Sequence, residues 1–239
     1  MKKNFVFICL MAMLVMPVFA QKKQLDWKNG EMPKLTNVKE IDDYLLTCDT
    51  IIRNLKAIDE NLLWYKVQKV QVTENDGSIS ETYHIVDQNG NFRGKNEALK
   101  QTLDVISVCL LLPLEAANIG LQTPLYTVAL PKLGLSAFKY GKYTKLGPQL
   151  AARCTTDVVD ILKKLRKQGK AIRALKKLTD ENGKLTDPNI DVSSYEGLEE
   201  FTEANPMEKT SKELSEILSH EQKADSSIGD LDDGALDIE

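Results

Sequence analysis

"SVCLLLPLEAANIGLQTPLYTVALP", residues 107–131, is the most apolar stretch of the chain outside its amino terminus, and it decides the fold class. The run from residue 105 to residue 114 is almost wholly apolar, and Glu115 interrupts it. A membrane-spanning helix needs about 20 mostly apolar residues, and a charge near its centre costs roughly 2.5–3.5 kcal/mol. We therefore expect a helix buried in a protein core, followed by a proline-broken connection. Conditional membrane insertion of residues 105–135 is the alternative.

Three segments around this stretch repeat apolar residues at steps of three and four, the spacing of an amphipathic helix. The first begins at Val38, and the second begins near Asn96 and ends at Pro113. The third begins about Pro148 and extends over about 30 residues, with Gln168 as the one polar member of its apolar seam. Helices with matching seams are typical of bundles. The sequence therefore predicts a mainly α fold, a helical bundle of about three long amphipathic helices.

A β-hairpin is predicted within residues 62–90. The segments "WYKVQKVQV" and "SISETYHIV" are rich in β-branched and aromatic residues, and they flank an Asp76-Gly77 pair that suits a hairpin turn. We expect this hairpin to be inserted into the bundle, which then comprises residues 37–180. Residues 21–36 precede the bundle as an N-terminal extension.

The first 20 residues, "MKKNFVFICLMAMLVMPVFA", have the order of a secretory signal peptide. Two lysines precede an apolar run that is too short to cross a hydrocarbon core about 30 Å thick, and a small-residue pattern ends at Ala20. Cys9 lies inside the apolar run, so we expect no lipid modification there. The sequence predicts cleavage after Ala20 and a secreted or periplasmic location.

The carboxyl-terminal part is predicted to hold a linker with short acidic helices, residues 181–224, and a disordered acidic tail, residues 225–239. Two capping-box spacings, Ser193 to Glu196 and Thr210 to Glu213, indicate where two short helices begin.

Charge is unevenly distributed along a chain whose net charge is -4. Residues 196–239 hold 14 acidic and 3 basic residues, whereas residues 139–184 hold 13 basic and 4 acidic residues. This opposition predicts an intramolecular contact between the acidic carboxyl-terminal segment, residues 196–239 with the acidic tail, and the basic region of residues 139–177, which includes the basic helix. A solvated helix face is the alternative explanation of the basic residues. We expect no nucleic-acid partner, and we select as candidate contacts to an anionic partner or lipid Lys139, Lys142, Lys145, Lys163, Lys164, Arg166, Lys167, Lys170 and Arg173.

Three cysteines follow the predicted cleavage site, Cys48, Cys109 and Cys154. An oxidising compartment favours pairing of two of them. Cys48 and Cys154 both lie on apolar seams, so they form the candidate disulfide. The alternative is that all three are buried free thiols, because free cysteine is among the most buried residue types.

The sequence carries no motif of a known chemistry. A Gly-rich phosphate loop, an HExxH pair and a nucleophile elbow are all absent, and the two histidines, His84 and His220, are far apart. We expect no cofactor. The leading hypothesis is a noncatalytic secreted or periplasmic helical protein that binds or scaffolds another envelope component. The alternative is a membrane-active helical protein whose apolar segment 105–135 or basic helix contacts lipid, and an enzyme is the third class.

Overall fold

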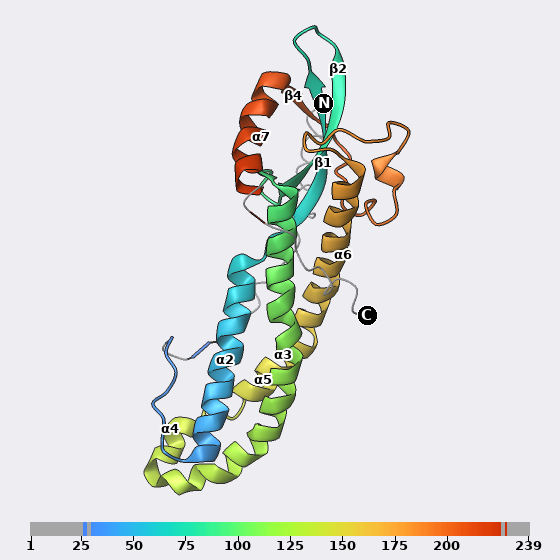
Figure 1. The fold of residues 1–239 in the computed structure, drawn as a ribbon. Coiled ribbons are helices and arrows are strands. Elements are labelled where there is room, and N and C mark those ends of the chain that lie inside the picture. The colour runs from blue at the N-terminus through green and yellow to red at the C-terminus, as the bar shows by residue number, and fades with distance from the viewer. Residues whose placement is uncertain (1–25, 28–29, 226–227, 229–239) are drawn as a thin grey trace, which may run out of the picture. The chain divides into compact units, whose positions relative to one another are not determined.

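The computed structural model describes residues 26–27, 30–225 and 228, with the side chains of residues 221–224 left out. The chain divides into two units, residues 1–34 and 35–239. In the first unit the Gly30 N–H donates to the Trp27 carbonyl at 2.9 Å, which closes a turn. The second unit is mainly α (Figure 1). The predicted signal peptide, and all of the predicted tail except Asp225 and Ile228, lie outside the described residues.

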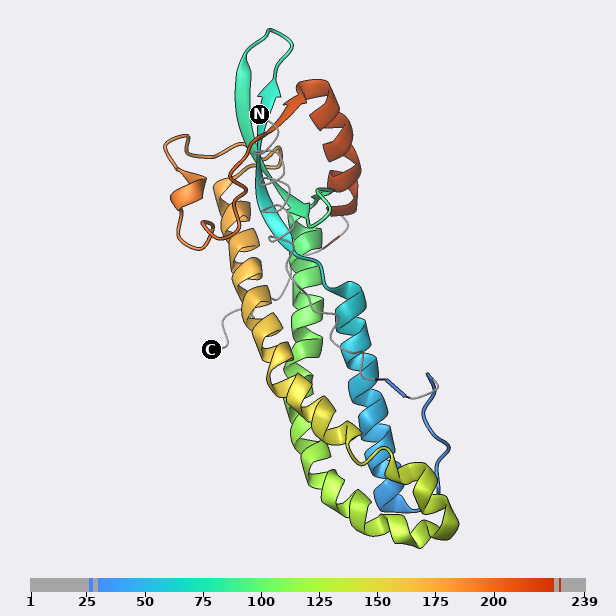
Figure 2. The same ribbon diagram turned by 180° about the vertical axis from the view of Figure 1, so that it is seen from behind.

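Helix α3 (Lys95–Ala129) is the central helix of the second unit. It contacts α2 (Lys39–Asn61), α5 (Leu146–Thr155) and α6 (Asp157–Leu178), and Figures 1 and 2 show α2 and α6 alongside it. The apolar seam expected from Val38 onward is buried in α2, at Ile41, Leu45, Cys48, Ile52 and Leu55. Burial of these seams is the main stabilising contribution to the helical part.

The prediction that the second helix ends at Pro113 is wrong. Helix α3 includes both Pro113 and Pro124 and continues to Ala129. A proline inside a helix removes one backbone hydrogen bond and costs about 3 kcal/mol or more, so burial of neighbouring side chains has to offset it. Leu112, Ile119 and Tyr126 are all fully buried around the two prolines.

The irregular connection expected at residues 123–147 is consequently helical over most of its length. The end of α3 leads into the 3-10 helix η1 (Leu130–Ser136) and then into α4 (Ala137–Gly141). Gly134 interrupts this run with a φ of 54°, in the left-handed region that glycine adopts without strain.

The third predicted helix is divided in two, which the sequence analysis did not foresee. Thr156, with φ -110° and ψ -68°, separates α5 from α6, and its N–H donates to the Ala152 carbonyl at 3.1 Å. Gly169, a residue that weakens a helix interior, lies buried inside α6 without interrupting it.

Gln168, the polar member of the predicted seam, is 1% exposed and fully hydrogen-bonded. Its Oε1 accepts from the Tyr65 N–H at 2.8 Å, and its Nε2 donates to the Thr102 hydroxyl at 2.9 Å and to the Leu63 carbonyl at 3.3 Å. A buried amide is tolerated when its donors and acceptors are paired. Gln168 therefore links α6 to α3 and to the start of the sheet.

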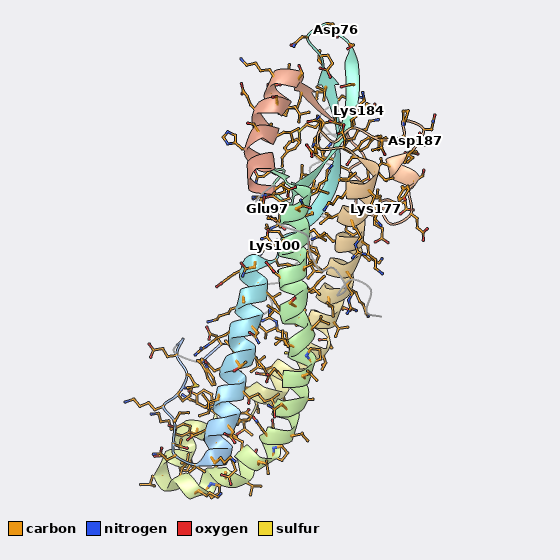
Figure 3. All side chains as sticks on the ribbon, in the orientation of Figure 1. Asp76, Glu97, Lys100, Lys177, Lys184 and Asp187 are labelled. Carbon is orange, nitrogen blue, oxygen red and sulfur yellow. The ribbon has the colours of Figure 1, made fainter. Side chains whose placement is uncertain are left out.

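The sheet has four strands in the order β3-β2-β1-β4, so the expectation of one inserted hairpin was incomplete. Strands β1 (Tyr65–Thr73) and β2 (Ile79–Asp87) pair antiparallel, with Tyr65 opposite Asp87. The turn between them holds Asp76, labelled in Figure 3, whose carboxylate accepts from the Ser78 N–H at 2.9 Å. The short strand β3 (Phe92–Arg93) adds to β2.

Strand β4 (Met207–Thr210) comes from the segment predicted to be linker and short helices, and it pairs parallel with β1. Helix α7 (Ser211–Asp225) follows at once, and its predicted capping box is formed. The Thr210 N–H donates to Glu213 at 2.9 Å, and the Glu213 N–H donates to the Thr210 hydroxyl at 3.3 Å. Helix α7 packs on the sheet through a cluster of Val70, Val72, Val86, Phe92, Met207, Leu214, Ile217 and Leu218.

The other capping-box spacing does not begin an α-helix. Residues 192–194 form only the 3-10 helix η2 (Val192–Ser194), and the Asp191 side chain caps it by accepting from the Ser193 N–H at 3.0 Å. The cap therefore begins one helical turn that does not extend.

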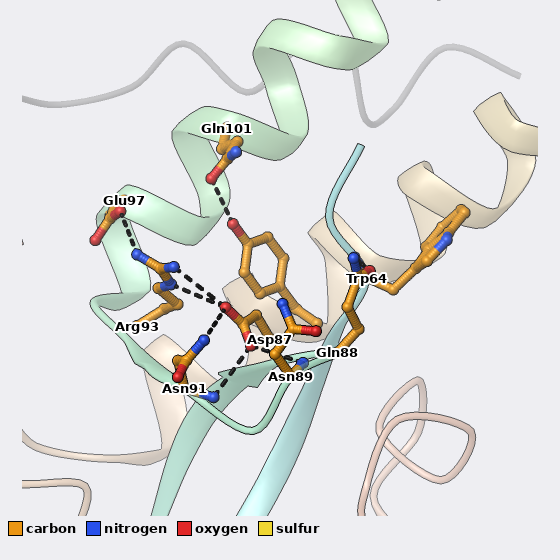
Figure 4. Close-up of polar contacts among 9 residues, drawn as sticks. Trp64, Asp87, Gln88, Asn89, Asn91, Arg93, Glu97 and Gln101 are labelled. Carbon is orange, nitrogen blue, oxygen red and sulfur yellow. Dashed lines mark hydrogen bonds and ion pairs between the residues drawn. The ribbon is translucent and has the colours of Figure 1, made fainter. Parts of the chain in front are cut away.

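A buried carboxylate closes the turn between β2 and β3 (Figure 4). Asp87 accepts from the Asn89 N–H at 2.8 Å and from the Asn91 N–H at 3.0 Å, and it forms an ion pair with Arg93 at 3.2 Å. Burial raises the pKa of Asp87, but the hydrogen bonds from Asn91 and Asn89 and the Arg93 charge outweigh it and hold that pKa below its ordinary value. With these partners in place, the cluster stabilises the turn.

Candidate functional site

The segment that joins α3 to α5, residues 130–145, is called the end segment here. It comprises η1, α4 and the turn after α4. Leu135 and Phe138 are 92% and 89% exposed, the highest values among the large apolar side chains of the described residues. Single exposed apolar residues are common, but two that are almost wholly exposed within four residues of one another favour a binding surface.

Two buried tyrosines fix the backbone of the end segment. The Tyr44 hydroxyl, from α2, donates to the Tyr143 carbonyl at 2.7 Å and accepts from the Gly147 N–H at 2.8 Å. The Tyr126 hydroxyl, from α3, donates to the Tyr140 carbonyl at 2.6 Å, and the rings of Tyr44 and Tyr126 stack with centroids 4.1 Å apart. Burial raises the pKa of both phenols, which therefore stay neutral donors. These hydrogen bonds anchor the Tyr140 and Tyr143 carbonyls of the end segment to α3 and α2.

Gly147 permits this close approach. A Cβ atom at position 147 would lie 2.8 Å from the Tyr44 ring and hydroxyl and 3.1 Å from Ile119, so only glycine fits without displacement.

The electrostatic character of the end segment is positive. No aspartate or glutamate occurs between Glu115 and Asp157, whereas Lys139, Lys142 and Lys145 are all exposed. The Nζ of Lys142 lies 4.8 Å from the centroid of the Tyr143 ring, a cation–π contact that keeps this amine at the surface. The end segment therefore carries three exposed amines close in sequence to Leu135 and Phe138, and a fourth lysine, Lys132, forms an ion pair with Glu40 of α2 at 2.8 Å.

The other six predicted basic residues lie on a separate element. Lys163, Lys164, Arg166, Lys167, Lys170 and Arg173 belong to α6, which contacts α3 and β1. The structure does not bring them together with the end segment, whose helix α4 packs on η1. Lys167 forms an ion pair with Glu200 at 3.0 Å, and Lys163 forms one with Asp160 at 3.9 Å. The predicted contact between the acidic tail and this helix stays a prediction.

Helix α3 carries an exposed apolar stripe that the sequence analysis missed. Its exposed members are Leu111, Leu114, Leu121, Leu125 and Val128, while Leu112, Ile119 and Tyr126 on the same helix are buried. The signal was in the opening stretch, because these residues recur at steps of three or four, or a multiple of them. The sequence analysis assigned the first of them to a buried helix and the last of them to the proline-broken connection. By length and composition alone, the helical run Lys95–Gly141 is long and apolar enough to cross a membrane, as are many core helices.

All three described cysteines are buried free thiols in this structure. Burial raises the pKa of Cys48 and of Cys109 to about 12, and that of Cys154 to about 11. Thiolates are the reactive form, so these cysteines are unsuited to nucleophilic catalysis. The Cys48–Cys154 disulfide stays a prediction.

A hollow of about 440 Å³ lies beside His84 and Lys95, between the sheet and the ends of α3, α6 and α7. The Lys95 amine donates to the Thr179 hydroxyl at 2.7 Å and to the Asp180 carbonyl at 2.6 Å, and His84 Nε2 bonds to the Thr82 hydroxyl at 2.9 Å. Lys95 and His84 are therefore each hydrogen-bonded to a neighbouring group of the protein, which is consistent with a structural role. Among the described residues, no three His, Cys, Asp or Glu side chains gather where they would hold a metal ion.

The buried histidine makes stability depend on pH. Burial, with a smaller contribution from the Lys95 charge, lowers the pKa of His84 to about 4, whereas the unfolded chain protonates near 6.5. The contribution of neutral His84 to the free energy of unfolding is therefore fully present above pH 6.5. As the pH falls toward 4, this contribution, on the order of 3 kcal/mol, is lost. Urea unfolding across this range should show the fall, and the His84→Gln variant should lack this component. An identical pH dependence in both proteins would rule the explanation out.

No family model, curated protein or solved structure matches this chain.

Proposed function

We propose that this protein is a noncatalytic protein of the cell envelope that binds the surface of an anionic membrane through its end segment. The envelope location rests on the predicted signal peptide, and the envelope component that it binds is then the lipid surface. One observation carries the proposal: Leu135 and Phe138 are about nine-tenths exposed on a segment that has exposed lysines and no acidic residue of its own, although Glu40 of α2 pairs with its Lys132.

The free energy of the proposed membrane binding can be estimated from the apolar and charged residues of the end segment. Burial of a leucine or phenylalanine side chain contributes about 1.5–3 kcal/mol, and each lysine near an anionic surface contributes about 1 kcal/mol. Two apolar residues with Lys139, Lys142 and Lys145 therefore supply roughly 6–9 kcal/mol, before the cost of immobilising the protein. This favours reversible, salt-sensitive attachment at the interface, with the core of α3 left intact.

The rest of the fold has a supporting part in the proposal. Helices α2 and α3, with α5 and α6 acting together as the third member, form a three-helix bundle that positions the end segment. In this proposal the β1–β2 hairpin, extended by β3 and β4, is an insertion between α2 and α3 of the bundle. The basic face of α6 remains a proposed contact for the acidic carboxyl-terminal residues.

Vesicle flotation of the exported protein tests the proposal. Vesicles containing phosphatidylglycerol are compared with pure phosphatidylcholine at 0.01 M and 1 M salt, where the screening length is about 30 Å and 3 Å. We expect flotation with the anionic vesicles at low salt and its loss at high salt. Equal flotation with neutral vesicles, or none with either, would contradict the proposal. Resistance to carbonate extraction would also contradict it and would favour insertion of residues 105–135.

A further inference from the structure

A second surface lies along α3, outside the end segment. Six side chains follow one another at steps of three and four over residues 111–128, and five of them are apolar and 56–78% exposed. The sixth, Asn118, lies near the middle and is also exposed. We call this set the α3 stripe: Leu111, Leu114, Asn118, Leu121, Leu125 and Val128.

The α3 stripe has the period of a coiled-coil seam rather than that of a core face. One heptad position is occupied by Leu111, Asn118 and Leu125. The position three residues later is occupied by Leu114, Leu121 and Val128. A seam that repeats every 3.5 residues is the pattern by which one helix packs lengthwise against another. The opposite face of α3 already packs within the chain, through residues such as Leu112 and Tyr126.

Asn118 indicates what covers the stripe. The Asn118 Oδ1 accepts from Gln122 Nε2 at 3.2 Å, so an apolar partner would leave the NH2 donors of Asn118 unpaired, which is unfavourable in a buried seam. A second asparagine offers both a donor and an acceptor, and a two-fold symmetric contact places identical residues opposite each other. A single asparagine at this heptad position is also known to fix register and pair number in parallel coiled coils.

We propose that the α3 stripe is the interface of a parallel homodimer, in which Asn118 of one copy contacts Asn118 of a second copy. The apolar area that the α3 stripe can bury limits the strength of this dimer. A leucine loses about 60–120 Å² when fully buried, so five side chains that are each more than half exposed supply on the order of 300–500 Å² per copy. A standard interface buries about 800 Å² per partner. The dimer is therefore weak and reversible, with a dissociation constant in the micromolar range.

Cysteine cross-linking without lipid tests this proposal. The native thiols at 48, 109 and 154 are buried, so Asn118→Cys introduces the one exposed thiol among the described residues. Oxidation should yield a disulfide-linked dimer. The matched control is Thr127→Cys, exposed on the same helix but outside the stripe, which should stay monomeric. Equal cross-linking of both variants would indicate random collision and would overturn the proposal, as would no cross-linking of either.

Sedimentation equilibrium provides the second measurement. The native protein should associate as its concentration rises, and Leu121→Glu should raise the dissociation constant at least about tenfold, because a charge enters the seam. Leu121 is 75% exposed, so this variant should fold with an unchanged melting temperature. A native protein that sediments as a monomer up to about 0.1 mM, a hundred times a 1 μM constant, would overturn the dimer. Neither experiment uses vesicles. A negative result would therefore overturn the dimer and would leave the proposed membrane binding to the flotation experiment.

Discussion

The double variant Leu135→Ser, Phe138→Ser is expected to bind anionic vesicles at least about 100-fold more weakly than the native protein. Transfer of these two side chains into the interface supplies roughly 3–6 kcal/mol, and each 1.4 kcal/mol is a factor of ten in affinity. Both side chains are about nine-tenths exposed, so the variant should retain its melting temperature. Titration of the protein with phosphatidylglycerol vesicles, followed by flotation, measures the difference.

The control for this prediction is Ile79→Ser. Ile79 is 69% exposed in β2, so the substitution removes exposed apolar surface outside the end segment, although from one side chain rather than two. We expect its vesicle binding to equal that of the native protein. An equal loss in both variants would show that the effect is unspecific, and full binding by the double variant would refute the role of the end segment.

Replacement of Tyr44 by alanine is expected to lower the free energy of unfolding by about 4 kcal/mol or more. The change removes a buried ring that stacks on Tyr126 at 4.1 Å, and it leaves the Tyr143 carbonyl and the Gly147 N–H without their partner. Tyr44→Phe keeps the ring and should cost about 2 kcal/mol, because only the hydrogen bonds are lost. Chemical denaturation of the three proteins measures both values.

Tyr195, which is 38% exposed, provides the matched comparison. Tyr195→Ala and Tyr195→Phe should each change stability by less than about 0.5 kcal/mol, as is usual for surface positions. If Tyr44→Phe were as stable as the native protein, the hydroxyl would not hold the end segment in place.

The helical character of the chain was predictable because apolar periodicity records burial directly. The seam from Ile41 to Leu55 is buried as expected, and the mainly α fold follows from such seams. Strand β4 was not predictable, because a four-residue edge strand has too few residues to show a period and its partner, β1, lies far away in sequence. The continuation of α3 through Pro113 depends on burial around the proline, which a local rule does not include.

The candidate site was predictable only in part. Composition indicated Lys139, Lys142 and Lys145, because clustered charge is visible in a sequence. Leu135 was not selected, since an apolar residue has the same letter whether it is buried or exposed. Phe138 begins the run FKYGKYTK, whose aromatic residues more often pack on their own domain, so it was not selected either. The six basic residues of α6 were grouped with the end segment by sequence proximity, and the intervening helix α5 places them on a separate element.

The most direct measurement of the central claim is the polarity around residue 138 during vesicle binding. Phe138→Cys carries an exposed thiol while the native cysteines are buried, so an environment-sensitive nitrobenzoxadiazole label attaches there selectively. The same label on Ile79→Cys is the reference. The account predicts a blue shift and a rise in emission at position 138 with phosphatidylglycerol vesicles at low salt, and no change at position 79. Unchanged emission at position 138, or equal changes at both positions, would contradict it.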